Sequence, residues 1–136
     1  MESDDTTVLI EAVRGAHLDM MSLLLDRGAD INKEVENIDT TALIEAVRGA
    51  HLDMVLLLLD RGADVNMEIK GTTVLIETVW RAHLDMVSLL LDRGADINKE
   101  VENITAFVAA LHRGHKHVLL RLLDRGADPG ELDIWL

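Results

Sequence analysis

Three histidines near the C-terminal end of the chain are spaced as H-x-x-H-x-H, a pattern that can bring imidazoles together around a metal ion. They are His112, His115 and His117, and three protein ligands are sufficient for a catalytic zinc site. His115, however, belongs to a series at corresponding places of a repeated sequence: His17, His51, His83 and His115. A histidine at a repeated position is expected to have a structural role, so we predict no metal site.

The other patterns that could support chemistry are incomplete. Asp30, Asn32 and Glu34 match positions 1, 3 and 5 of an EF-hand calcium loop. Val35 and Thr41, however, replace the glycine and the glutamate that positions 6 and 12 require. The sequence contains no cysteine, no G-x-S-x-G motif and no glycine-rich nucleotide-binding loop. We therefore predict no enzymatic activity and no cofactor.

The dominant feature of the sequence is internal repetition. The triplet GAD recurs at spacings of 34, 32 and 32 residues, beginning at Gly28, Gly62, Gly94 and Gly126. Residues 6–32 and 40–66 differ at four of 27 positions, and the fourth copy is more divergent. A period of this length is typical of solenoids, in which each unit buries its apolar face against the next unit.

Each copy predicts two short helices followed by a loop. Thr41 is placed to cap a helix over residues 42–48, and residues 52–60 predict a second helix that ends at Gly62. The alternation in residues 67–71 (MEIKG) favours an extended turn. If Ala50 between the helices had a positive φ it would be strained, and we expect the neighbouring Gly49 to let the turn shift by one residue.

These copies resemble ankyrin repeats over residues 6 to 129. The end of each copy matches the family closely as LLLDRGADIN, LLLDRGADVN, LLLDRGADIN and LLDRGAD, whereas TVLI, TALI, TVLI and TAFV match the family's T-P-L-H less well. The resemblance implies an all-α-type solenoid, a single domain of four stacked helix-turn-helix repeats with protruding hairpin loops. The repeats would cover about 6–39, 40–71, 72–103 and 104–129, with a C-terminal capping tail at 130–136.

The resemblance also implies a non-catalytic module that binds a protein partner through its concave groove and hairpin tips. Trp80 and Arg81 break the Glu–Arg pattern of the first two copies, and a lone tryptophan beside arginine is typical of an interface hot spot. The alternative is a tryptophan that only packs over its neighbouring repeat. The predicted partner-binding residues are Trp80, Arg81, His112, Arg113, Arg48, Glu45, Glu77 and Lys70. The three-residue spacing of Glu45 and Arg48 predicts an ion pair within one helix.

Charge limits the kind of partner. The chain has 25 acidic and 13 basic residues and a formal net charge of −12, which disfavours nucleic acid and anionic membranes and favours a basic protein or peptide. No apolar run approaches the roughly 20 residues of a membrane span. The start, MESDDTT, lacks the basic and apolar regions of a signal peptide. We expect a cytoplasmic, intracellular protein.

The similarity of the copies leaves a second hypothesis open. Groove residues selected for one target would differ between copies, so their uniformity favours an engineered or structural scaffold without a dedicated partner, or a recent duplication. The unequal spacings favour a natural origin, because idealised arrays keep one repeat length. The first copy lacks polar capping substitutions, which an upstream repeat, an idealised design or self-association through this uncapped N-terminal repeat would each explain.

Overall fold

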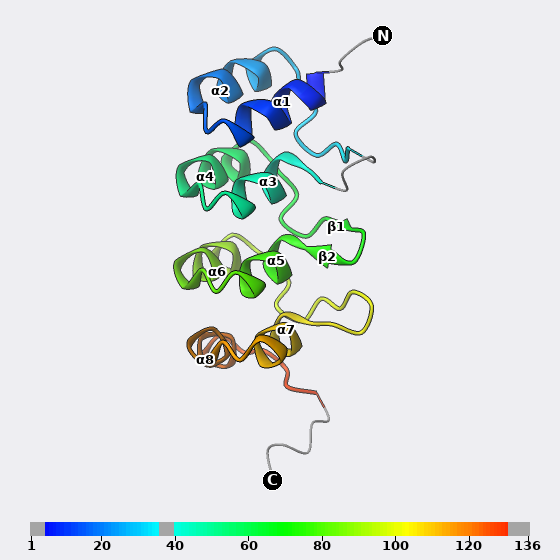
Figure 1. The fold of residues 1–136 in the computed structure, drawn as a ribbon, viewed down its shortest axis with the longest axis vertical. Helices are drawn as coiled ribbons and strands as arrows, with labels where there is room; N and C mark the ends of the chain where they lie inside the picture. Colours follow the sequence, from blue (N-terminus) through cyan, green and yellow to red (C-terminus); the bar gives the residue numbers. More distant parts are fainter. Residues whose placement is uncertain (1–4, 36–39, 131–136) are drawn as a thin grey trace.

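The computed structural model describes residues 5–35 and 40–130, which form four helix pairs stacked in a row (Figure 1). We refer to these pairs as the first to fourth repeats, and to the two members of each pair as its first and second helix. The pairs are α1 (Asp5–Arg14) with α2 (Leu18–Asp26), α3 (Ala42–Arg48) with α4 (Leu52–Asp60), α5 (Val74–Trp80) with α6 (Leu84–Asp92), and α7 (Ala106–Arg113) with α8 (Lys116–Asp124). The predicted solenoid is therefore confirmed. None of the described helices is long and apolar enough to cross a membrane.

Threonine side chains fix the starts of three first helices. The hydroxyl of Thr41 accepts a hydrogen bond from the backbone N–H of Ile44 at 3.3 Å, as expected of an N-cap residue. Thr73 and Thr105 cap α5 and α7 in the same way. The second helix predicted for residues 52–60 and its end at Gly62, which has a φ of 96°, are also observed.

The turn between the two helices of a repeat differs from the expectation. The turn does not shift onto Gly49, which has a φ of −84°; instead Ala50 adopts a φ of 56°. A Cβ on Gly49 would lie 2.5 Å from ring atoms of His51, so this glycine makes room for the imidazole. The third repeat has Arg81 at the glycine position and still places Ala82 at a φ of 57°. The glycine before the alanine therefore affects how the histidine side chain packs. It does not decide which residue of the turn has the positive φ.

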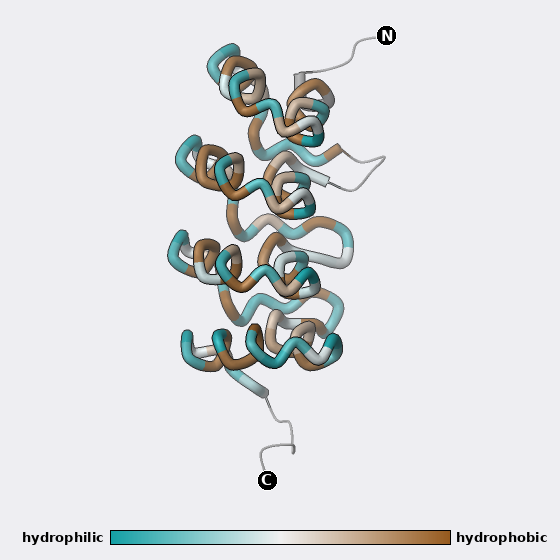
Figure 2. Tube along the Cα trace, turned by 60° about the vertical axis from the view of Figure 1, so that its left-hand side comes forward, coloured by the Kyte–Doolittle hydropathy of each residue, from teal (hydrophilic) through white to brown (hydrophobic). Residues whose placement is uncertain are grey.

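The core is continuous through the stack and is aliphatic except for Phe107. Leu9, Leu43, Leu75 and Phe107 hold equivalent places in the first helices, and each is at most 3 % exposed. The first helices pack on one another more closely than the second helices do. Hydrophobic and hydrophilic stretches alternate along every helix pair (Figure 2). The repeats are thus built to cover each other, as the periodicity predicted.

Hairpin loops project beside the first helices (Figure 1). β1 (Glu68–Ile69) pairs antiparallel with β2 (Thr72–Thr73), which confirms the extended turn expected at residues 67–71. The corresponding loop of the next repeat is closed by a bridge between Val101 and Ile104. The capping tail predicted for residues 130–136 lies, apart from Gly130, outside the described residues.

Asparagine side chains at the end of each GAD-x-N motif join neighbouring repeats. Asn66 accepts a hydrogen bond from the backbone N–H of Asp96 at 2.7 Å and donates to the carbonyl of Gly94 at 3.1 Å. Asn32 makes the same two bonds to the second repeat, and Asn98 accepts from the N–H of Asp128 at 2.9 Å. The asparagine therefore binds the same motif in the next repeat.

Arginine and aspartate of the recurring DRGAD sequence form a second link between repeats. Each arginine pairs with the aspartate that ends the second helix of the preceding repeat: Arg61 with Asp26 at 2.9 Å, Arg93 with Asp60 at 2.8 Å and Arg125 with Asp92 at 2.6 Å. All six side chains are at least one-third exposed, so each pair adds modestly to stability.

Candidate interaction surface

The first helices carry a ladder of charged residues that runs from repeat to repeat. Arg14 Nε lies 2.6 Å from Glu45 Oε1 in the second repeat, and Arg48 Nε lies 2.8 Å from Glu77 Oε1 in the third. Arg48 also contacts Glu45 within its own helix, at 3.2 Å. The predicted ion pair within one helix is therefore present, together with bonds across repeats that the three-residue spacing did not indicate.

Glu45 is held in its charged form by this ladder. Burial alone would raise its pKa, but hydrogen bonds from Arg14 and Thr40 and the charges of Arg14 and Arg48 together lower the pKa below its ordinary value of 4.5. The hydrogen bond to Glu45 also raises the pKa of Arg14. The carboxylates and guanidinium groups of the ladder therefore already have partners of opposite charge within the protein.

The ladder stops at the third repeat. Trp80 stands where the next arginine would be, and Ala109 stands where its glutamate would be. Trp80 is half-buried against the core, and its carbonyl contacts His115 Nε2 at 3.1 Å. The guanidinium of Arg113 lies 5.7 Å from the centroid of the Trp80 ring, within the range of a cation–π contact. The tryptophan thus joins the third and fourth repeats and remains partly exposed as a residue.

Basic side chains without acidic partners among the described residues occur where the ladder stops. Arg81, His112 and Arg113 are exposed, and none of them makes an ion pair with another described residue. Arg81 only donates a hydrogen bond to the carbonyl of Arg48, at 3.3 Å. We call Trp80, Arg81, His112 and Arg113 the Trp80 surface.

The remaining predicted residues fall into two groups. Glu45, Arg48 and Glu77 belong to the ladder, and Glu77 is only 7 % exposed as a residue. Lys70 is exposed at the turn between β1 and β2. The Trp80 surface and the ladder are therefore adjacent parts of one face, whereas Lys70 belongs to the hairpin.

One signal in the sequence that marks this surface was missed. No aspartate or glutamate occurs between Glu102 and Asp124, although 25 occur in the whole chain. The interval contains most of the fourth repeat, including exposed Lys116 and His117. The net charge of −12 therefore conceals a fourth repeat that is locally basic.

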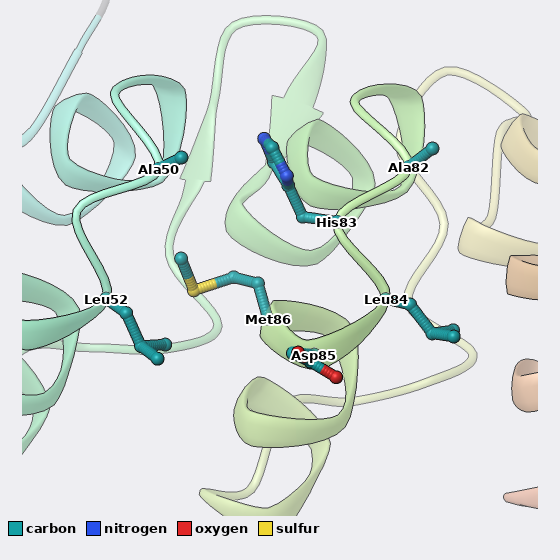
Figure 3. Close-up of a pocket in the computed structure, with 7 residues that line it drawn as sticks. All are labelled: Ala50, Leu52, Ala82, His83, Leu84, Asp85 and Met86. Atoms are coloured by element: carbon teal, nitrogen blue, oxygen red, sulfur yellow. The ribbon is translucent and has the colours of Figure 1, made fainter.

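The histidines and the pockets are the remaining candidates for a site, the histidines for a metal ion and the pockets for a ligand. Among the described residues, no group of three histidine, aspartate or glutamate side chains is close enough to hold a metal ion, and this includes His112, His115 and His117. A pocket of about 480 Å³ lies between the helix turns of the second and third repeats, where Met86 extends towards the side of Leu52 (Figure 3). An equivalent pocket recurs between the third and fourth repeats, so these hollows follow from the stacking.

Comparison with known proteins agrees with this architecture. The family profile described as ankyrin repeats (3 copies) matches residues 1–69, and the profile described as ankyrin repeat matches residues 70–100. No curated protein matches the chain. The fourth helix pair lies beyond both family matches, yet α7 and α8 continue the stack.

Proposed function

This chain belongs to the ankyrin-repeat family, and from that premise we propose that it binds a protein partner at the Trp80 surface. Ankyrin repeats are generally protein-interaction modules, and the family is typically non-catalytic. The proposal assigns the recognition role to Trp80, Arg81, His112 and Arg113. The proposal also assigns further contacts to the hairpins, with Lys70 exposed at one turn.

The observation that supports this surface is the contrast between the ladder and its end. On the first two repeats the arginines are already bonded to glutamates, so a ligand would have to break existing pairs. At the Trp80 surface, Arg113 lies over the aromatic ring of Trp80, and the exposed Arg81 and His112 are the sequence neighbours of these two residues. None of the three basic side chains has a carboxylate partner among the described residues. Arginine and tryptophan are the residues that most often dominate binding energy at interfaces.

The local charge also defines the partner. The net charge favours a basic ligand at long range, but the contacts at the Trp80 surface favour a segment that carries aspartate or glutamate. Carboxylates accept paired hydrogen bonds from guanidinium groups, and an apolar side chain beside them would cover the Trp80 ring. We therefore propose an acidic peptide segment with at least one apolar residue as the bound element.

Selection from a random peptide library on the immobilised full chain tests the proposal. We expect enriched peptides to be rich in aspartate and glutamate, and their affinities can be measured by fluorescence polarisation. The double variant Arg81→Ala, Arg113→Ala should weaken binding at least tenfold, about 1.4 kcal/mol or more. Both side chains are exposed, so the fold should be unaffected.

A matched variant separates the surface from total charge. Arg61→Ala, Arg93→Ala removes the same number of charges from the side of the second helices and should bind the peptides like the wild type. Equal loss in both variants would refute the assignment of the surface. If no peptide is enriched, the uniformity of the repeats would favour the scaffold hypothesis instead.

A further inference from the structure

The outer face of the first repeat exposes side chains that the later repeats bury. Met20 and Val8 are 57 % and 39 % exposed, whereas Met54 and Ala42, their counterparts in the second repeat, are each 1 % exposed. Leu23 is 49 % exposed, and it lines a pocket of about 360 Å³ on this face together with Met20 and Val8. Among the described residues, the first repeat therefore exposes side chains at the positions where each later repeat packs against the repeat before it.

The charged side chains of this face also lack the links found inside the stack. The side chain of Glu11 is 68 % exposed, whereas that of Glu45 is 9 % exposed and bonded to the preceding repeat. Arg27 occupies the position of Arg61, which pairs with an aspartate of the preceding repeat. Among the described residues Arg27 makes no ion pair. Two polar links are therefore available on this face as well as an apolar surface.

The outer face of the fourth repeat matches the outer face of the first repeat when the two are aligned as neighbouring repeats are inside the stack. Leu120 is 47 % exposed and occupies the position of Ser88, whose hydroxyl accepts a hydrogen bond from Arg121 in the following repeat. Arg121 in turn occupies the position of Leu23. A junction between two copies with the same geometry would therefore bring the exposed Leu120 of one copy against the exposed Leu23 of the other.

The polar positions match in the same register. Asp124 corresponds to Asp92, which pairs with the arginine of the following repeat, so Asp124 would meet Arg27. His112 corresponds to Arg14, which pairs with the glutamate of the following repeat, so His112 would meet Glu11. The asparagine link has no counterpart, because Gly130 stands at that position.

We propose that copies of this chain associate head to tail, with the outer face of the fourth repeat seated on the outer face of the first repeat of the next copy. The contact continues the internal junctions and joins two different surfaces, so it leaves one free face at each end of the assembly. Such a heterologous contact produces an open series of oligomers that grows with concentration. Because the asparagine link has no counterpart at this contact, the association is weaker than an internal junction and is reversible.

Sedimentation velocity of the full chain over a concentration series tests this arrangement. The wild type should form larger species as its concentration rises. Leu23→Glu disrupts the outer face of the first repeat, and Leu120→Glu disrupts the outer face of the fourth repeat. Each variant alone should therefore remain monomeric. Both leucines are about half exposed, and circular dichroism should show that both variants are folded. An equimolar mixture should form dimers and nothing larger, because one intact face of each kind remains.

Leu52→Glu provides the matched control. Leu52 is 45 % exposed and lines the pocket between the second and third repeats, so it belongs to neither the first nor the fourth repeat (Figure 3). This variant should oligomerise like the wild type. A wild type that stays monomeric at every concentration would overturn the proposal, as would loss of association in Leu52→Glu. Dimers formed by either Leu23→Glu or Leu120→Glu alone, or a mixture that fails to dimerise, would also overturn it.

Discussion

Five of the seven residues in the recurring DRGADIN segment have an identifiable structural role. The first aspartate and the arginine link second helices, and the glycine adopts a positive φ. The second aspartate accepts a hydrogen bond from the backbone N–H two residues later, as Asp64 does from Asn66 at 2.9 Å. The asparagine binds the next repeat. The near-identity of the copies in this segment therefore reflects packing and does not by itself indicate ligand binding.

The alanines in the helix turns are strained, because an L-residue with a side chain disfavours the left-handed region by about 1 kcal/mol. Ala50 has a φ of 56°, while Gly114 occupies the equivalent turn in the fourth repeat with a φ of 68°. We expect Ala50→Gly to raise the free energy of unfolding by about 1 kcal/mol, measured by urea denaturation. Gly114→Ala should lower the free energy of unfolding by a similar amount. The added Cβ meets no atom within 4 Å, so the backbone strain at this positive φ is the only cost. A stabilising Gly114→Ala would contradict this account.

Glu45 should make stability depend on pH. Its pKa is lowered in the folded chain, so its charged form stabilises the fold above the ordinary value of 4.5. That contribution is lost as the pH falls through the still lower value of the folded state. Glu45→Gln should therefore lower the free energy of unfolding by about 1.5 kcal/mol at pH 7, and the difference should shrink below about pH 4.5. Glu11→Gln, at a side chain that is 68 % exposed, is the control and should change the free energy of unfolding little at pH 7.

At the level of secondary-structure elements, the sequence predicted the helices and their ends better than the contacts between them. The caps at Thr41, Thr73 and Thr105 follow from local chemistry, so a single copy was sufficient to place them. The bonds from Arg14 and Arg48 to the next repeat depend on how two helices face each other, which no spacing within one helix reveals. The sequence also did not indicate that Gly49 makes room for the imidazole of His51, because that contact depends on how the side chain folds back over the turn.

The asparagine links should carry measurable energy between elements. Asn66→Ala removes two hydrogen bonds that join the second and third repeats. The free energy of unfolding should fall by about 1 to 2 kcal/mol in urea denaturation. Asn66→Asp keeps an acceptor for the N–H of Asp96 but loses the donor to Gly94, so its stability should lie between those of the wild type and Asn66→Ala. Equal stability of all three proteins would show that the asparagine link does not contribute to the free energy of unfolding.

At the level of the whole molecule, repetition explains both what the sequence revealed and what it concealed. The stack and its repeat number followed from the GAD spacing, because each helix pair buries its apolar face only against a neighbour. The Trp80 surface was found as an exception to the repeat. The basic character of the fourth repeat was concealed by the total charge, and the complementarity of the two ends became visible only when Leu23, Met20 and Leu120 were seen to be exposed.

The uneven distribution of acidic residues has a consequence for the rate at which an anionic ligand arrives. Far from the molecule such a ligand is repelled by the summed charge of −12, and close to the fourth repeat it is attracted. At about 0.15 M salt the Debye length is only about 8 Å, so the distant repulsion fades while contacts at the surface persist. Encounter should therefore be faster at physiological ionic strength than in dilute buffer, which is the reverse of ordinary electrostatic steering.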